Sequence, residues 1–202
     1  MLKLKNVSKF YYSKGVIASG FSKVNLELNM GEFVVITGES GSGKSTLLNI
    51  IAGQIKNYEG NLRFQNFPSN VTTASETNLQ IGYMLQHDHL FYWRTIYQNV
   101  CLGLEIKNEM TKENQEYVIS LLKKYGLYDF KDKKPSQLSG GMRQRAALIR
   151  TLALNPKLLL LDEPFSALDY QTRLQVSGDI GNIIRENNKT AILVTHNLSE
   201  AI

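Results

Sequence analysis

The first 30 residues of the chain alternate between apolar and polar side chains, as in the stretches LKLKNVSKF and FSKVNLELNM. A period of two is typical of antiparallel strands that bury one face. Four later stretches are short and almost continuously apolar, which is the pattern of strands buried on both faces. These predicted buried strands are FVVIT at 33–37, IGYML at 81–85, LLLLD at 158–162 and TAILVT at 190–195. The polar residues 61–80 predict edge strands and loops.

Helical periodicity fills the intervals between these strands. The expected helices span residues 44–52, 111–125, 139–154 and 170–187. Thr111 is the expected N-cap of the second helix, Gly126 lies just past its end, and Pro135 separates it from the third. Strands separated by helices predict an α/β fold with a mainly parallel sheet and helices on both faces. An antiparallel β part would precede this sheet, and a helical insertion would interrupt it.

Length and composition favour one folded domain. The chain has 202 residues, of which 43% are hydrophobic and 20% charged, so it can bury a core and is not disordered. Cys101 is the single cysteine, which excludes an intramolecular disulfide and fits a reducing compartment. The longest apolar run inside the chain ends at Leu161, far short of the roughly 20 residues of a membrane-spanning helix. The N-terminal sequence MLKLKNVSKF has no apolar core of a signal peptide.

The chain is basic, with a net charge of +5 and a pI near 9.2. A solvated basic surface, an anionic ligand, a nucleic acid and an anionic membrane face all fit this charge. The net charge alone does not distinguish these partners, and the sequence motifs are needed to do so.

A glycine-rich loop follows the first predicted buried strand and opens the first predicted helix. Its sequence GESGSGKS matches G-x-x-x-x-G-K-[ST], in the strand–loop–helix context that this motif requires. The glycines let backbone N–H groups surround phosphate oxygens, and the helix N-terminus adds a partial positive charge. Lys44 is expected to reach the β- and γ-phosphates, and the Ser45 hydroxyl to bind Mg²⁺. The predicted nucleotide-binding residues of this loop are Gly38, Glu39, Ser40, Gly41, Ser42, Gly43, Lys44, Ser45 and Thr46.

Two carboxylates end the third predicted buried strand, in LLLLDEP. Ligands bind at the carboxyl ends of strands in open α/β sheets. Asp162 is therefore a candidate metal ligand. Glu163, one residue further along a strand, is expected to point to the opposite side and to act on a water that attacks the γ-phosphate. Two solvated carboxylates at a strand exit are the plain alternative.

A second glycine motif, LSGGMRQR, begins the third predicted helix. Ser139, Gly140 and Gly141 would form another exposed helix N-terminus able to accept phosphate. One nucleotide cannot easily occupy both helix ends within one small subunit, which suggests a site completed by a second subunit. An ordinary Ser-Gly-Gly helix cap explains the same residues equally well.

Taken together, these motifs resemble the ATP-binding subunit of ABC transporters. The resemblance covers essentially the whole chain and follows the family's order: GESGSGKST, Gln86, LSGGMRQR, LLLLDEP, SALD and His196. It implies one ABC ATPase domain over residues 1–202, with a P-loop NTPase core at about 1–86 and 154–202 and a helical lobe at about 87–153.

The resemblance also implies roles for single residues. Gln86 would be the loop glutamine at the metal, with a part in catalysis alongside Lys44, Glu163 and His196. The segment from Ser139 through Gly140 and Gly141 to Gln144 would cap the ATP of a partner subunit. Asp169 in SALD would cross the dimer interface, and His196 would reach the γ-phosphate. Tyr11 would stack on adenine, although Phe10 and Tyr12 are alternatives.

The implied cofactors are ATP and Mg²⁺, and the implied assembly is a pair of such subunits that clasps two ATP molecules. The resemblance implies a peripheral position at the cytoplasmic face of the membrane, an integral membrane permease as partner, indirect contact with an extracytoplasmic solute-binding protein, and no nucleic acid. The Trp-Arg-Thr at 93–95 with the Asn-Val at 99–100 resembles importers of nitrate, sulfonate and taurine, or of thiamine-pyrimidine precursors. Family members usually continue well beyond the histidine, so we expect the last sheet elements to be missing through truncation near Ile202.

Three other functions compete with this interpretation. A soluble ABC ATPase acting in DNA repair or translation would carry long coiled coils or two cassettes, and this chain has one motif set and no sustained heptads. A P-loop kinase for a small molecule would not need LSGGMRQR or SALD. A non-catalytic binding module would not need Lys44, Glu163 and His196.

Overall fold

The computed structural model describes residues 2–13, 16–64, 80–166, 168–186 and 188–197. Of the expected edge strands and loops at 61–80, residues 65–79 lie outside the described residues, as does the expected break near Ile202.

The N-terminal alternation folds into an antiparallel sheet, as predicted. Its strands are β1 (Leu2–Ser13), β2 (Val16–Leu28) and β4 (Glu59–Phe64), in the order β2-β1-β4. Residues Leu2 and Leu4 on β1 are buried while Lys3 and Lys5 between them are exposed. The period of two thus separates one buried face from one solvated face.

The four apolar runs form a second sheet in which every pairing is parallel. Its strands are β3 (Phe33–Thr37), β5 (Ile81–Met84), β6 (Leu158–Asp162) and β7 (Thr190–Thr195), in the order β3-β7-β6-β5. Every residue of β6 and β7 is buried, as expected. The prediction of full burial was wrong for β3 and β5, which alternate or stay half-buried. Both flank the central pair, so one edge of each has no strand beside it among the described residues.

Five α-helices surround the parallel sheet in the described part of the chain. They are α1 (Lys44–Ile51), α2 (Ile96–Ile106), α3 (Lys112–Lys124), α4 (Gly140–Leu152) and α5 (Tyr170–Glu186), with short 3₁₀ turns η1 (Tyr128–Phe130) and η2 (Pro135–Gln137). The predicted cap of α3 is confirmed, because the Thr111 side chain accepts a hydrogen bond from the Asn114 backbone N–H. Gly126 follows that helix with φ 69°, a conformation that favours glycine.

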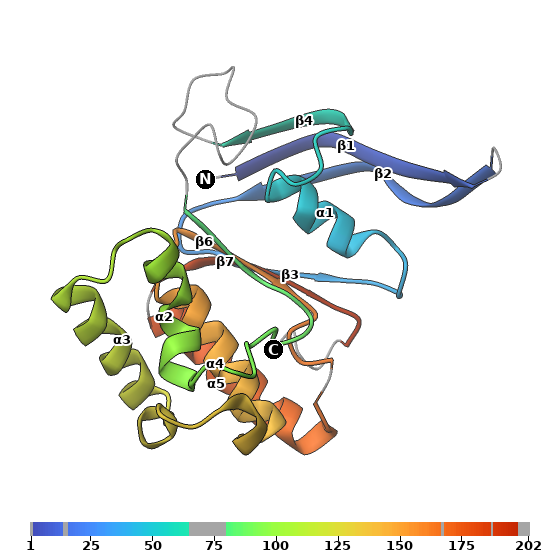
Figure 1. Ribbon diagram of the computed structural model, residues 1–202. Coiled ribbons are helices and arrows are strands. Elements are labelled where there is room, and N and C mark those ends of the chain that lie inside the picture. Colours follow the sequence, from blue (N-terminus) through green and yellow to red (C-terminus); the bar gives the residue numbers. More distant parts are fainter. Residues whose placement is uncertain (1, 14–15, 65–79, 167, 187, 198–202) are drawn as a thin grey trace.

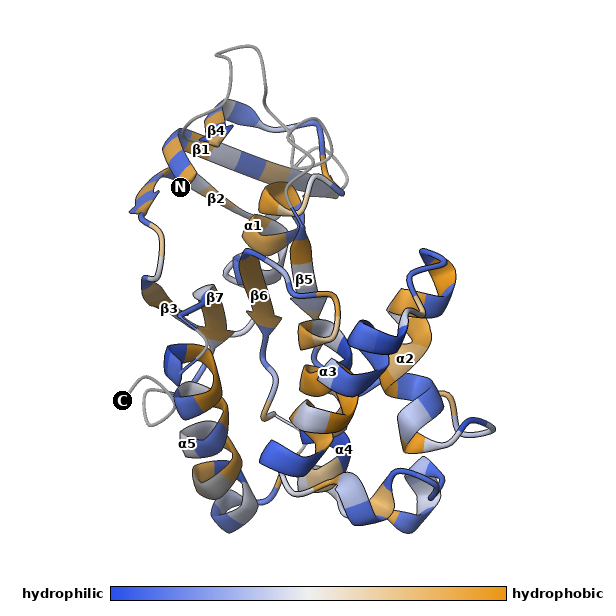
Figure 2. Ribbon diagram, turned by 90° about the vertical axis from the view of Figure 1, so that its left-hand side faces the viewer, coloured by the Kyte–Doolittle hydropathy of each residue, from blue (hydrophilic) through white to orange (hydrophobic). Residues whose placement is uncertain are grey.

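The parallel sheet separates two hydrophobic clusters. Leu158 and Leu160 face α1 and the antiparallel sheet, whereas Leu159 and Leu161 face the helices of the other side. The antiparallel sheet and α1 form the upper part of Figure 1, and α2 to α5 form the lower part. Figure 2 shows β3, β6 and β7 as hydrophobic strands between these two parts. The helical side holds α2, α3, α4 and α5 in one continuous cluster, and the boundaries of a lobe at 87 and 153 stay a prediction.

The helices of the described residues contain no candidate for a membrane span, since none combines sufficient length with sufficient apolar character.

Candidate functional site

The parallel register brings the ends of four strands to one edge of the sheet. Thr37 pairs with Thr195, Met84 with Leu161, and Asp162 with Val194. The segments that leave these strands therefore begin side by side. They carry the Gly38–Thr46 loop, Gln86, the two carboxylates and His196, which is the convergence that the motifs predicted.

The glycine-rich loop turns back on itself before α1 begins. Gly41 and Gly43 have φ values of 81° and 93°, so the loop requires a backbone conformation that glycine adopts readily. Lys44 is buried, and its Nζ donates to the carbonyl oxygens of Gly38 at 2.8 Å and Glu39 at 2.7 Å. The ammonium group is thus held at the mouth of the loop, where a phosphate would meet it.

Asp162 lies behind Ser45 at the start of α1. The Ser45 hydroxyl donates to Asp162 Oδ1 at 2.8 Å, and the Tyr83 hydroxyl lies 3.4 Å from Oδ2. Tyr83 also donates to Asn49 Oδ1 at 2.9 Å. Burial and the nearby Glu163 raise the pKa of Asp162, and burial beside Asp162 raises that of the Tyr83 phenol. Sequence reasoning missed Tyr83 and Asn49, which carry no motif signal.

Glu163 lines the same cavity as Lys44, and a turn rather than the expected alternation of a strand directs its side chain. Strand β6 ends at Asp162, and Glu163 has φ 44°, so the alternation of a strand does not extend to it. Its Oε1 lies 3.9 Å from Lys44 Nζ, and its Oε2 lies 3.0 Å from His196 Nδ1. The Glu163 backbone N–H donates to the Val194 carbonyl at 2.9 Å, which fixes this turn on the sheet.

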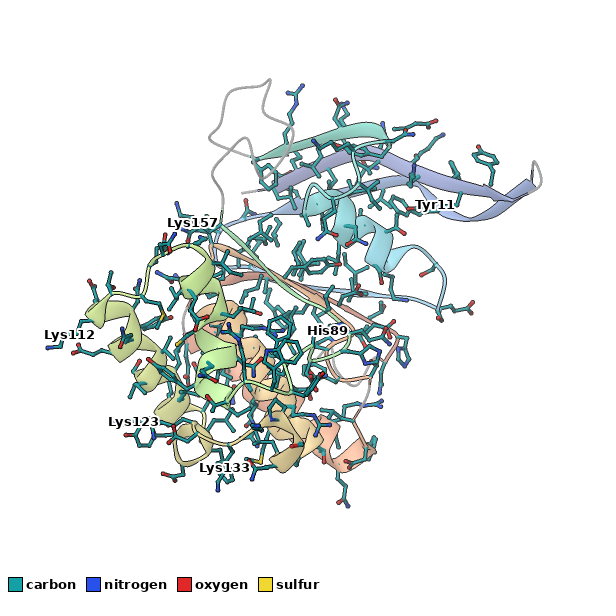
Figure 3. All side chains as sticks on the ribbon, viewed as in Figure 1. Tyr11, His89, Lys112, Lys123, Lys133 and Lys157 are labelled. Atoms are coloured by element: carbon teal, nitrogen blue, oxygen red, sulfur yellow. The ribbon has the colours of Figure 1, made fainter. Side chains whose placement is uncertain are left out.

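A cavity of about 310 Å³ opens over these groups. It is lined by Tyr11, Gly20, Ser40, Gly41, Gly43, Lys44, Ser45, Thr46, Gln86 and Glu163. Of the three candidate aromatics, Tyr11 lines the cavity and Phe10 and Tyr12 do not. Figure 3 shows Tyr11 on the β1–β2 ribbon. Gly20 was missed in the sequence; a Cβ there would lie 2.3 Å from the Lys9 carbonyl oxygen, so only glycine fits beside β1.

The second glycine motif lies elsewhere in the same chain. Ser139 is the N-cap of α4, and its Oγ accepts from the Met142 backbone N–H at 3.3 Å. Gly141 is buried against α5, where a Cβ would lie 2.8 Å from the Thr172 side chain. Ser139, Gly140 and Gly141 do not line the cavity of their own chain.

Gln144 and Asp169 differ from each other in exposure. Gln144 is 3% exposed, and its Nε2 lies 3.4 Å from the Gln86 carbonyl oxygen. The side chain thus turns inward from α4, and its contact with the nucleotide of a partner subunit stays a prediction. Asp169 is exposed and accepts from the Thr172 backbone N–H at 3.1 Å. Hydrogen bonds with Thr172 hold the pKa of Asp169 below its usual range.

Comparison with known proteins decides the family. The sequence model of the ABC transporter family matches residues 21–166. The chain belongs to the ABC transporter family. As an ABC transporter ATP-binding protein it has the P-loop NTPase cassette fold, and membership implies ATP hydrolysis coupled to transport.

Relatives of this ABC protein match it over its whole length. An uncharacterized ABC transporter ATP-binding protein of Bacillus subtilis, YtlC, is 46% identical over 201 residues, which are 100% of this chain and 75% of YtlC. The taurine import ATP-binding protein TauB of Ruegeria pomeroyi is 38% identical and is covered to 74%. Among solved structures, a dimeric ATP-binding cassette in a post-hydrolysis state with bound ADP and Pi has a TM-score of 0.80. It is 38% identical, and the match covers 100% of this chain and 90% of that one.

Proposed function

We propose that this ABC protein is the ATP-hydrolysing subunit of a bacterial importer and that the Gly38–Thr46 loop binds its ATP. One observation carries the proposal: Lys44, Ser45, Asp162, Glu163 and His196 converge on one edge of the parallel sheet. Tyr11 lies on the antiparallel sheet and lines the same cavity, where its ring would stack on the adenine.

The donor set at this edge fits Mg²⁺. Hard oxygen ligands suit that ion, and the Ser45 hydroxyl and the Asp162 carboxylate already lie 2.8 Å apart. Burial raises the pKa of Asp162, and a cation beside it would oppose that shift. Ser45, Asp162 and Gln86 would hold the ion, which would supply neutralisation of phosphate charge.

Hydrolysis then needs a water molecule placed between the γ-phosphate and Glu163. The water oxygen bonds to the γ-phosphorus while the bond to the ADP oxygen breaks, and the water proton passes to Glu163. His196 lies 3.0 Å from Glu163 and would orient its carboxylate and contact the phosphate. Lys44, held beside the loop carbonyls, would neutralise the developing charge.

A second copy of the chain would complete each site. Ser139 and Asp169 are exposed and lie outside the cavity of their own chain. The N-terminus of α4 offers free N–H groups to an anion from another molecule. The solved cassette that resembles this chain is a dimer with ADP and Pi, which supports the same assembly here. Ser139, Gly140, Gly141 and Asp169 are then the residues lent to the partner's nucleotide.

The work of this dimer would be done on an integral membrane permease at the cytoplasmic face of the membrane. The connection from β5 to α2 begins with the loop that carries Gln86 (residues 85–90, the Gln86 loop). Tyr92 and Trp93 follow this loop and are 73% and 57% exposed. Exposed aromatics favour a protein partner. Taurine import by TauB supports a small sulfonate-like solute, delivered by an extracytoplasmic binding protein. A soluble role in DNA repair or translation is not favoured by these relatives.

The decisive experiment replaces Glu163 by Gln. The variant should bind ATP with unchanged affinity and lose turnover by about 100-fold or more, because it keeps the shape of the side chain and removes the proton acceptor. ATP should also trap it as a dimer in size-exclusion chromatography. Glu116→Gln on the exposed face of α3 is the matched control and should behave as the parent protein. Unchanged turnover in Glu163→Gln would overturn the assignment of the catalytic base.

A further inference from the structure

The loop that carries Gln86 is fastened to α4 along its backbone. Three of its carbonyl groups receive hydrogen bonds from α4 side chains. Gln144 Nε2 lies 3.4 Å from the Gln86 oxygen, and the Arg150 guanidinium donates to the oxygens of Asp88 at 2.7 Å and His89 at 2.8 Å. Figure 3 labels His89 in this loop, between the sheet above and the helices below. The position of the loop is therefore tied to that of α4, the helix that Ser139 caps.

Asp88 adds a charged contact to these backbone bonds. Its Oδ2 lies 3.0 Å from Arg143 Nε, and its Oδ1 accepts from the Leu90 backbone N–H at 3.1 Å. The same Arg143 donates through Nη1 to the Leu138 carbonyl at 2.8 Å. Leu138 immediately precedes Ser139. One guanidinium thus joins the Gln86 loop to the segment that presents Ser139.

The two arginines act from one side of α4. Arg143 and Arg150 are seven residues apart, which places them on the same face of a helix. Burial lowers the pKa of Arg150, and the neighbouring Asp88 offsets part of that effect. His89 has φ 44°, a conformation that a non-glycine residue rarely adopts. The Arg150 bond to its carbonyl holds the loop in this shape.

We propose that Asp88 and Arg143 are positioning residues that fix Gln86 and the Ser139 helix cap as one body. The inference rests on the proposed function, in which Gln86 meets the nucleotide of its own chain and Ser139 meets that of the partner. A change at one nucleotide site is passed through the Asp88–Arg143 pair to the other. Neither residue touches the cavity, so neither is a catalytic residue.

This arrangement predicts a specific kinetic signature. The Gly38–Thr46 loop does not depend on the pair, so the first encounter with ATP should be unaffected. Assembly of the closed site depends on the relative placement of Gln86 and Ser139, and small misplacements slow a positioned reaction strongly. Loss of the pair should therefore act on kcat and leave KM for ATP nearly constant.

The test is a double-mutant cycle on the full chain. Asp88→Ala and Arg143→Ala should each lower kcat about tenfold and change KM less than about twofold. The loss of kcat in the double variant should be clearly smaller than the product of the two single losses, because both single variants remove the Asp88–Arg143 contact. Asp88→Asn retains a neutral acceptor for Leu90 and Arg143 and should fall between the parent and Asp88→Ala. It keeps the test decisive should either alanine variant fail to fold.

Lys124→Ala is the matched control. Its ion pair with Glu186 is 2.9 Å long and joins α3 to α5 without touching the Gln86 loop or Ser139, so kcat should not change. Additive losses in the double variant, or a rise in KM at constant kcat, would overturn the inference. An inactive parent protein would instead refute the proposed function, so the two failures are distinguishable.

Discussion

The direction of a side chain at the site is set by single backbone angles that no motif encodes. Glu163 turns toward Lys44 and His196 because its φ is 44° and its strand has already ended. Gln144 turns inward from α4, and its amide nitrogen donates a hydrogen bond to the Gln86 carbonyl. The sequence motifs thus predict candidate site residues, whereas backbone turns and packing determine which atoms their side chains face.

Tyr11 and Tyr12 allow a prediction at this scale. Both are exposed neighbours on β1, at 41% and 67%, and Tyr11 alone of the two lines the cavity. Stacking of an aromatic ring on a base contributes about 1–3 kcal/mol. Tyr11→Ala should therefore weaken ATP binding about tenfold or more in calorimetry, whereas Tyr12→Ala should leave the affinity unchanged. Equal effects of the two substitutions would contradict adenine stacking by Tyr11.

The helices and strands were largely predictable because they depend on local patterns. The cap of α3 at Thr111 and the alternation in β1 need only neighbours within a few residues. The half-burial of β3 was not predictable, since it depends on which strands stand beside it. The fastening of the Gln86 loop was not predictable either. Asp88 and Arg143 are 55 residues apart and meet because β5 and α2, the elements on either side of Asp88, both pack against α4.

The segment 91–95, which leads from the Gln86 loop into α2, is held by a side chain of α2. The Asn99 side chain is fully buried, and its Oδ1 accepts from the Phe91 backbone N–H. Its Nδ2 donates to the carbonyls of Phe91 at 3.0 Å and Thr95 at 2.9 Å. The Asn99 side-chain amide thus holds the turn at 91–95, which contains the exposed Tyr92 and Trp93.

Asn99→Ala should therefore destabilise the fold. It would leave the Phe91 backbone N–H without its partner, whereas the Phe91 and Thr95 carbonyls keep the backbone N–H groups of Arg94 and Asn99. A backbone N–H group left without a partner costs about 1–3 kcal/mol, so we expect a loss of about 2 kcal/mol in urea unfolding. Asn182→Ala on the exposed face of α5 should cost less than about 0.5 kcal/mol. A loss as small for Asn99 as for Asn182 would show that the turn does not depend on this amide.

For the whole molecule, the central observation is that the two helix ends proposed to bind phosphate do not line one cavity. The N-terminus of α1 faces the cavity that Lys44 and Glu163 line, while Ser139 caps α4 on the helical side. Hydrogen bonds from α4 side chains to the Gln86 loop connect the sheet side to the helical side. A complete site in the proposed dimer takes one helix end from each copy.

This geometry predicts how activity depends on protein concentration. Where most of the protein is monomeric, the amount of dimer rises with the square of concentration, so doubling the protein should raise the ATPase rate about fourfold. Mixing gives a sharper result. Lys44→Ala abolishes the site built on its own loop, and Ser139→Arg abolishes the site that borrows its helix cap. Each variant alone should be inactive, yet their mixture should hydrolyse ATP. In the mixed dimer, one site pairs the intact loop of the Ser139→Arg copy with the intact cap of the Lys44→Ala copy. A rate strictly proportional to concentration, together with an inactive mixture, would mean that each chain hydrolyses ATP alone.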